Sequence, residues 1–286
     1  MKAGRDTKQR VIPGFIYFGR PPVMIAFLYL FLIPFFFHNE ATGILYSGQS
    51  PEHQTPVRPE GGDNDAINVS SIPTPLDFSR TVPEEGSFSD WVRRLPLKKG
   101  LEVMDYRGHR VHTGFDSIFA VIDKPLLFDQ NLEQCADFAM RLWADYHKET
   151  DQLETLTLFE YDGTGKPFRT SGQSYNEFLR TAFAFSNSYS LKAGCAEVDP
   201  ENVGPGDLIV QNERGGIGHV SMILDECRSE DGRRLYLIGY SYMPAQEFHI
   251  EKAGDEYGKD GWFSMEGYYR YLADHLDLGT PVLRRF

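Results

Sequence analysis

Hydrophobic and polar residues divide the chain into three regions. Residues 21–38 begin with a run of apolar side chains that carries no charge, residues 39–85 are polar, and residues 86–286 show the mixed periodicities of a folded domain. The apolar run is just long enough to cross a bilayer, and residues 1–20 carry five basic side chains against one acidic one, which favours their retention in the cytoplasm. We therefore expect an uncleaved signal anchor, or transmembrane helix, at residues 21–38. A cleaved signal peptide, with secretion of the rest, is the alternative.

The region from residue 39 to residue 85 is predicted to be a linker. Six of the 17 prolines of the chain lie in it, and Gly61 and Gly62 interrupt any periodicity. This composition favours an extended chain without a core of its own. The folded domain is therefore expected at residues 86–286.

Helical periodicity is clearest from Asn131 to His147. Asn131 can cap this helix, and Gln134 stands where a capping box has Glu or Gln, so that Cys135 falls in the first turn. A second helix is predicted from Ser174, with Glu177 as its capping-box partner. The apolar residues of the first helix recur at helical spacing: Leu132, Cys135, Ala136, Ala139, Leu142, Trp143 and Tyr146.

Strand patterns dominate the second half of the domain. Because helices come first and a meander of strands follows, the sequence predicts an α+β fold with helices packed on a small antiparallel sheet. Asp231-Gly232 is typical of a two-residue hairpin turn. Such a turn would place Ser221 opposite Tyr242 and would put Tyr240 and Tyr242 on the same face of the sheet as His219. The predicted strands are residues 117–123, 207–211, 219–226 and 234–242.

Charge and cysteine content narrow the function classes. The formal net charge is −12 and the pI about 5.1, which argues against nucleic acid as the main partner. Three cysteines are too few for a disulfide framework, although Cys195 and Cys227 could form one bond if the domain is exported. No cofactor and no metal site are expected.

A cysteine and a histidine are the candidate catalytic residues. The positive end of the helix dipole stabilises a thiolate, so Cys135 at a helix start has the setting of a nucleophile. His219 begins a strand directly after a glycine-rich turn, where a strand would hold an imidazole rigidly as a general base. A third group should orient the imidazole. Gln246 is our candidate for it, while Tyr240, Tyr242 and Ser241 stay open.

Two resemblances accompany these residues. Residues 205–210 and 218–225, with the Cys-Ala-Asp-Phe stretch that begins at Cys135, resemble the NlpC-type (papain-like) cysteine peptidases and amidases. Trp91 to Leu97, Gln134 to Asp137, Gly218 to Val220 and Ser241 to Gln246 together resemble the bacterial family catalogued as domain of unknown function 4846. The first resemblance implies a papain-like fold. The second implies an exported, often membrane-anchored protein and carries no established activity.

The sequence therefore favours a membrane-anchored cysteine hydrolase whose domain lies outside the cytoplasm, in the periplasm. Cys135 would attack the carbonyl of an amide, and His219 would move the proton; the resemblance to NlpC-type enzymes implies an envelope amide, such as a peptidoglycan peptide, as the substrate. The alternative is a non-catalytic envelope-binding or structural module of the same fold, with Trp91 and Trp262 among its ligand contacts.

Overall fold

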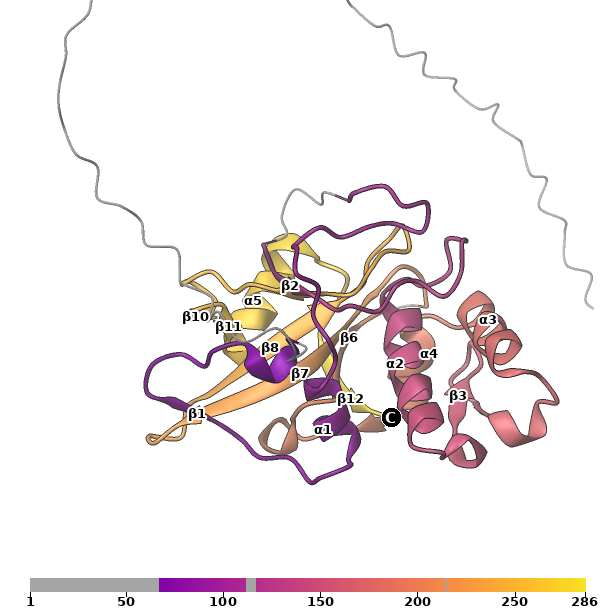
Figure 1. Ribbon diagram of the computed structural model, residues 1–286, viewed down its shortest axis with the longest axis horizontal. Coiled ribbons are helices and arrows are strands. Elements are labelled where there is room, and N and C mark those ends of the chain that lie inside the picture. Colours follow the sequence, from indigo (N-terminus) through magenta and orange to yellow (C-terminus); the bar gives the residue numbers. More distant parts are fainter. Residues whose placement is uncertain (1–66, 112–116, 214) are drawn as a thin grey trace, which may run out of the picture. The chain divides into compact units, whose positions relative to one another are not determined.

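The computed structural model describes residues 67–111, 117–213 and 215–286 (Figure 1). These residues belong to one unit, Glu60–Phe286. The predicted basic segment 1–20 and signal anchor 21–38 lie outside the described residues. Within the described residues, no helix combines the length and the apolar character that crossing a membrane requires.

A ten-stranded sheet forms the centre of the domain. Its main path runs β10-β11-β8-β7-β6-β12-β5, while β1 pairs with β7, β9 with β8 and β2 with β9. All of these described pairs are antiparallel, so the predicted α+β class with an antiparallel sheet is confirmed, although the sheet is larger than expected. The strands are β1 (Phe78–Arg80), β2 (Ile118–Val121), β5 (Ala196–Glu197), β6 (Leu208–Gln211), β7 (His219–Ser229), β8 (Arg234–Tyr240), β9 (His249–Glu251), β10 (Gly258–Lys259), β11 (Trp262–Phe263) and β12 (Val282–Arg285). A separate hairpin joins β3 (Thr157–Phe159) to β4 (Gly165–Pro167).

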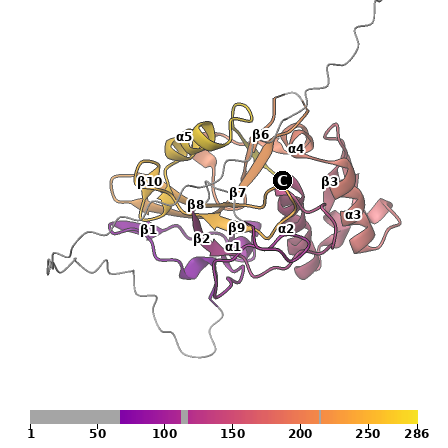
Figure 2. The same cartoon turned by 90° about the horizontal axis from the view of Figure 1, so that it is seen from above.

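Helices cover both faces of the long strands. Figure 2 shows α5 on one side of β7 and β8, and α1 and α2 on the other. The helices are α1 (Phe88–Arg93), α2 (Cys135–Glu149), α3 (Tyr175–Phe185), α4 (Ser188–Gly194) and α5 (Met265–His275), with short 3-10 turns at Val69–Ser71, Leu153–Thr155, Phe168–Thr170 and Pro200–Asn202.

Strand alternation sends neighbouring residues of β7 into two different cores. Val220 and Met222 belong to the cluster that contains the apolar residues of α1, α2 and α3, whereas Ile223 belongs to the cluster that contains those of α5. Every residue of β7 from His219 to Cys227 is buried. Because both faces are covered, the polar side chains of the strand are buried as well, among them Ser221, Asp225 and Glu226.

The folded domain begins earlier than residue 86. Val69 and Phe78, inside the predicted linker, are buried in the core on the α2 side. Phe78 and Arg80 are the first and last residues of β1, which pairs with β7. Arg80 also reaches Asp225 of β7, with 2.5 Å between its Nε and a carboxylate oxygen. The described part of the segment before residue 86, from residue 67, is therefore part of the domain.

The start of α2 lies four residues after the predicted cap. Gln134 itself is the N-cap, and its partner in the capping box is Asp137. Asn131 has another role, because its side-chain oxygen accepts a hydrogen bond from the backbone N–H of Ala245 at 2.6 Å. Cys135 consequently becomes the first residue of the helix. The predicted start of α3 is confirmed, since Ser174 caps it with Glu177 in the capping box.

The β7–β8 hairpin differs from the predicted two-residue turn. Ser229 donates to the carbonyl of Arg233, which leaves a three-residue loop whose last residue, Gly232, has a φ of +87°. A bulge between Ile223 and Asp225 adds a second shift of one residue. Met222 is thereby opposite Gly239, which places Ser221 level with Tyr240 rather than with Tyr242. Two shifts of one residue restore the alternation, so the predicted face of the two tyrosines is unchanged.

Candidate functional site

Cys135 lies at the head of α2, against the beginning of β7. The backbone N–H groups of Val220, Ala136 and Cys135 itself face its sulfur. The residue is 8% exposed, and this burial raises the pKa of the thiol to about 11. The neighbouring carboxyl of Asp137 also raises that pKa, and the three amides lower it. The amides are therefore placed to stabilise a thiolate, but burial keeps the thiol protonated at neutral pH.

His219 is the first residue of β7 and is completely buried. Its ring packs edge-on against Tyr240, with 4.8 Å between ring centroids, and against Tyr242 at 5.7 Å. Among the described residues, neither ring nitrogen has a hydrogen-bond partner. Burial, followed by the proximity of His249, lowers the pKa of His219 to about 3. The ring is therefore neutral at physiological pH.

The two candidate residues meet through the backbone rather than through their side chains. The sulfur of Cys135 faces the amide of Val220, which is one peptide group from His219. Cys135 belongs to the core on the α2 side. The imidazole contacts Tyr240, whose hydroxyl lies 3.1 Å from that of Tyr271 on α5, so the ring is on the other face of the sheet. The structure brings the two residues to one place without joining them by a hydrogen bond.

The four candidates for the third group differ in their surroundings. Tyr240 and Tyr242 pack against the imidazole. Ser241 donates instead to the carbonyl of Gln246 at 2.7 Å and to that of Glu133 at 3.1 Å. The side chain of Gln246 is completely buried, and within the described part of the chain its amide oxygen and nitrogen have no hydrogen-bond partner.

Residues 241–247 form a segment that crosses the start of α2; we call it the cover segment. Ser241 and Ala245 bind it to residues 131–133 through the two bonds already described, to Glu133 and Asn131. The carbonyl of Ala245 also accepts a hydrogen bond from the N–H of Tyr106 at 2.9 Å. The cover segment thus joins the residues before α2 to Tyr106, and its Tyr242 packs against the imidazole of His219.

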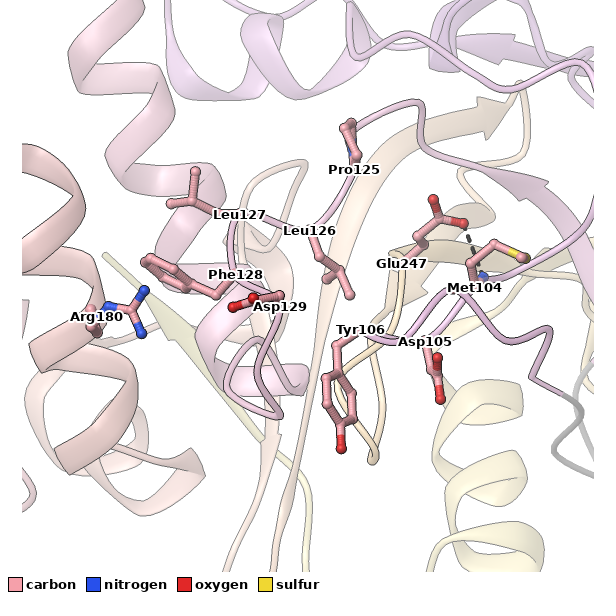
Figure 3. A pocket seen from close by; sticks show the side chains of 11 residues that line it. Met104, Asp105, Tyr106, Pro125, Leu126, Leu127, Phe128, Asp129, Arg180 and Glu247 are labelled. Atoms are coloured by element: carbon pink, nitrogen blue, oxygen red, sulfur yellow. Dashed lines mark hydrogen bonds between the residues drawn. The ribbon is translucent and has the colours of Figure 1, made fainter.

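An open cavity lies beside the cover segment (Figure 3). Its volume is about 520 Å³. The guanidinium of Arg180 lies over the ring of Phe128 at 4.3 Å, and Glu247 binds Lys98 at 2.5 Å. The N–H groups of His109 and Arg107 hold the pKa of the Asp105 carboxyl below its usual value. The lining residues are Met104, Asp105, Tyr106, Gly108, Pro125, Leu126, Leu127, Phe128, Asp129, Arg180 and Glu247.

The sequence analysis did not identify this cavity or two buried residues of β9. The cavity is assembled from several distant segments, and no local pattern marks it. His249 and Glu251 are completely buried. The ring centroid of His249 lies 4.5 Å from that of Tyr240, and Glu251 accepts a hydrogen bond of 2.8 Å from the Tyr240 hydroxyl. Their spacing on either side of Ile250, in a strand pattern, is the signal that could have placed them on the face of Tyr240.

The cysteines do not form the bond that the sequence allowed. Cys195 and Cys227 are both free and buried, as is Cys135. No group of three metal-binding side chains lies together in the part of the chain that the structure describes.

Comparison with known proteins identifies a family and no activity. A family model described as domain of unknown function (4846) matches residues 69–170 and 164–275, which is more than half of the chain. The resemblance drawn from the sequence to that family is therefore confirmed. No curated protein and no solved structure matches.

Proposed function

Since the chain belongs to the family described as domain of unknown function 4846, which assigns no chemistry, we propose a function from the site itself: a cysteine hydrolase of the papain-like kind. Cys135 is the nucleophile and His219 the general base. The observation that supports this is the position of the Cys135 sulfur, facing backbone amides at a helix start, next to a buried histidine whose ring nitrogens lack hydrogen bonds to the described residues. Buried polar groups are nearly always paired, so such an exception is often functional.

The proposed reaction uses the two side chains in turn. The Cys135 thiol gives its proton to the His219 imidazole, and the sulfur forms a bond to the carbonyl carbon of an amide. The backbone N–H of Cys135 stabilises the oxyanion. The C–N bond then breaks, the amine takes the proton from His219, and a thioester stays on the enzyme. Water, deprotonated by His219, hydrolyses the thioester to a carboxylic acid and restores the thiol.

This chemistry requires that the cover segment move. A thiol with a pKa of about 11 does not give its proton to an imidazole with a pKa of about 3 while both are buried. Burial is the largest cause of both values, so contact with water or a polar substrate would bring them together. We infer that substrate binding in the adjacent cavity displaces the cover segment and lets the start of α2, with Cys135, move to the imidazole, which stays on its own face of the sheet.

The proposed substrate is an amide of the bacterial envelope, such as a peptidoglycan peptide. This choice rests on the resemblance to NlpC-type enzymes and on the signal anchor predicted at residues 21–38, which would hold the domain outside the cytoplasm. Protease added to spheroplasts tests that location: digestion of the domain without lysis supports it, and protection until lysis contradicts it.

The burial of Cys135 and His219 favours a second candidate, a non-catalytic binding module. In this case the open cavity, with Tyr106 and Phe128 on its wall, holds the ligand. Trp91 and Trp262, which the sequence suggested as ligand contacts, are buried: the indole of Trp91 donates to Glu149 and that of Trp262 to the carbonyl of Pro73.

Hydrolysis of peptidoglycan fragments separates the two candidates. The full chain is incubated with a muropeptide digest, and new amines and carboxylates are followed by mass spectrometry. We expect wild type and Cys195→Ser, a matched change at another buried free cysteine, to cleave the digest, and Cys135→Ser and His219→Gln to lose cleavage. Cleavage by Cys135→Ser would refute the nucleophile. Saturable binding without cleavage by wild type would replace the hydrolase by the binding module.

A further inference from the structure

Three aromatic rings form a row across three neighbouring strands on the α5 face. His219 is on β7, Tyr240 on β8 and His249 on β9, and Tyr240 is directly paired with His249. The centroid of the Tyr240 ring is 4.8 Å from that of His219 and 4.5 Å from that of His249, and both contacts are edge-to-face. All three residues are completely buried. The ring of Tyr240 therefore lies between two imidazoles.

The hydroxyl of Tyr240 is fixed at the far end of this ring. It donates to a carboxylate oxygen of Glu251 at 2.8 Å and lies 3.1 Å from the hydroxyl of Tyr271 on α5. Glu251 is completely buried, and Tyr271 is 3% exposed. Two hydrogen-bond partners from different elements restrict the movement of the phenol ring. The Tyr240 ring is consequently held in a fixed position against the imidazole of His219.

The other candidates for orienting His219 lack such an arrangement. The hydroxyl of Ser241 is used by two backbone carbonyls. The Gln246 side chain makes no hydrogen bond to any residue that the structure describes. Tyr242 contacts the imidazole at a longer distance and follows the end of β8.

We propose that Tyr240, anchored by Glu251, is the positioning residue of His219, in place of Gln246. The proposal rests on the proposed function only in that it takes His219 as the catalytic base. Tyr240 acts through ring contact, by restricting the orientations of the imidazole, and not by a hydrogen bond to it. Removing the hydroxyl anchor should therefore disturb the imidazole of His219 even though the phenyl ring is kept.

Nuclear magnetic resonance of the full chain labelled with ¹³C and ¹⁵N at histidine tests this without any substrate. The signals of His219 are assigned by their loss in His219→Gln. We expect Tyr240→Phe to shift and broaden these signals. Glu251→Gln keeps an acceptor for the hydroxyl and should stay close to wild type. Gln246→Leu, a matched change at the competing residue, should leave them unchanged.

Two results would overturn the proposal: unchanged His219 signals in Tyr240→Phe, or a larger change in Gln246→Leu. If circular dichroism shows that Tyr240→Phe does not fold, Tyr271→Phe removes the second partner of the same hydroxyl, and the signals are judged on that variant by the same criteria. The imidazole signals also respond to the other rings beside it, Tyr242 and His249, so comparison among variants carries the result.

A kinetic arm separates this proposal from the hydrolase proposal. With cleavage established, we expect Tyr240→Phe to lower kcat by roughly tenfold to a hundredfold with little change in KM, because misplacement of a catalytic group has effects of that size. Gln246→Leu should lower kcat less than Tyr240→Phe does. Absence of cleavage by wild type refutes the hydrolase, while the spectra still decide whether Tyr240 fixes the ring.

Discussion

Replacing His219 by glutamine should remove much of the acid sensitivity of the fold. The imidazole is completely buried, and its pKa falls from 6.5 in the unfolded chain to about 3 in the folded one. Between these values the unfolded chain binds a proton that the folded chain does not. The stabilising contribution of the neutral ring is thus complete above pH 6.5 and is lost as the pH falls toward 3.

The size of the effect follows from the two pKa values. Each pH unit between them removes about 1.4 kcal/mol from the free energy of unfolding. The loss caused by His219 should reach roughly 2–3 kcal/mol at pH 4.5 and about 5 kcal/mol well below pH 3. Glutamine is neutral throughout, so the variant should gain on wild type by these amounts as the pH is lowered, whatever its stability at pH 7.

Urea unfolding followed by tryptophan fluorescence measures the difference, with wild type and variant compared at pH 7.5, 6, 5 and 4.5. His109→Gln is the matched control, because the side chain of His109 is 72% exposed and stays in water in both states. Parallel pH profiles for wild type and His219→Gln would refute the reasoning, since they would mean that the ring of His219 is hydrated in the folded protein.

Three further predictions test other parts of the structure. Iodoacetamide should alkylate Cys135 about 300-fold more slowly than a free thiol at pH 7.5, because the pKa of the Cys135 thiol is about 11 and that of a free thiol about 8.5. Peptide mass spectrometry measures the alkylation rate. Equal rates for Cys135 and a free thiol would show that the sulfur is exposed to solvent. Gly218→Ala should lower the free energy of unfolding in urea by about 1–3 kcal/mol, because a Cβ there would lie 2.2 Å from the carbonyl oxygen of Gln211. Gly216→Ala is the control: its Cβ would face open space, and the free energy of unfolding should change by less than about 0.5 kcal/mol. Asp225→Ala should lower the free energy of unfolding by about 3–5 kcal/mol in the same assay, because it leaves Arg80 and Arg93, now at 2.5 and 2.6 Å, without their buried carboxylate. A loss below about 1 kcal/mol would contradict a stabilising role of this carboxylate.

Local signals in the sequence were sufficient for several elements. Ser174 and Glu177 define the start of α3 because both halves of a capping box are side chains that bind neighbouring backbone. Strands β6, β7 and β8 begin within a residue of their predicted positions, because their apolar runs are bounded by Gly and Asp. Local signals do not determine the start of α2, because Asn131 and Gln134 can both cap a helix. Only the contact of Asn131 with Ala245 decides between them.

Properties that depend on distant contacts could not be read from the sequence. Nothing local indicates that β1, inside a proline-rich segment, pairs with β7, or that α5 covers the face of His219. The sequence also identifies Cys135 and His219 as a candidate nucleophile and general base, but it does not show that both side chains are buried. Burial depends on how segments far apart in the sequence pack, and it sets the pKa of both groups.

The place of β12 in the sheet has a consequence for biosynthesis. Residues 282–285 lie between β6 and β5, and Arg285 binds the buried carboxylate of Asp207 beside β6. A ribosome delivers this strand long after β6 has emerged, so a nascent chain displays the unpaired edge of β6 until residues 282–285 have left the ribosome. An exposed strand edge invites pairing with other chains. We therefore expect the chain to depend on chaperones during its synthesis. Truncation at residue 281, which removes β12, should cause aggregation.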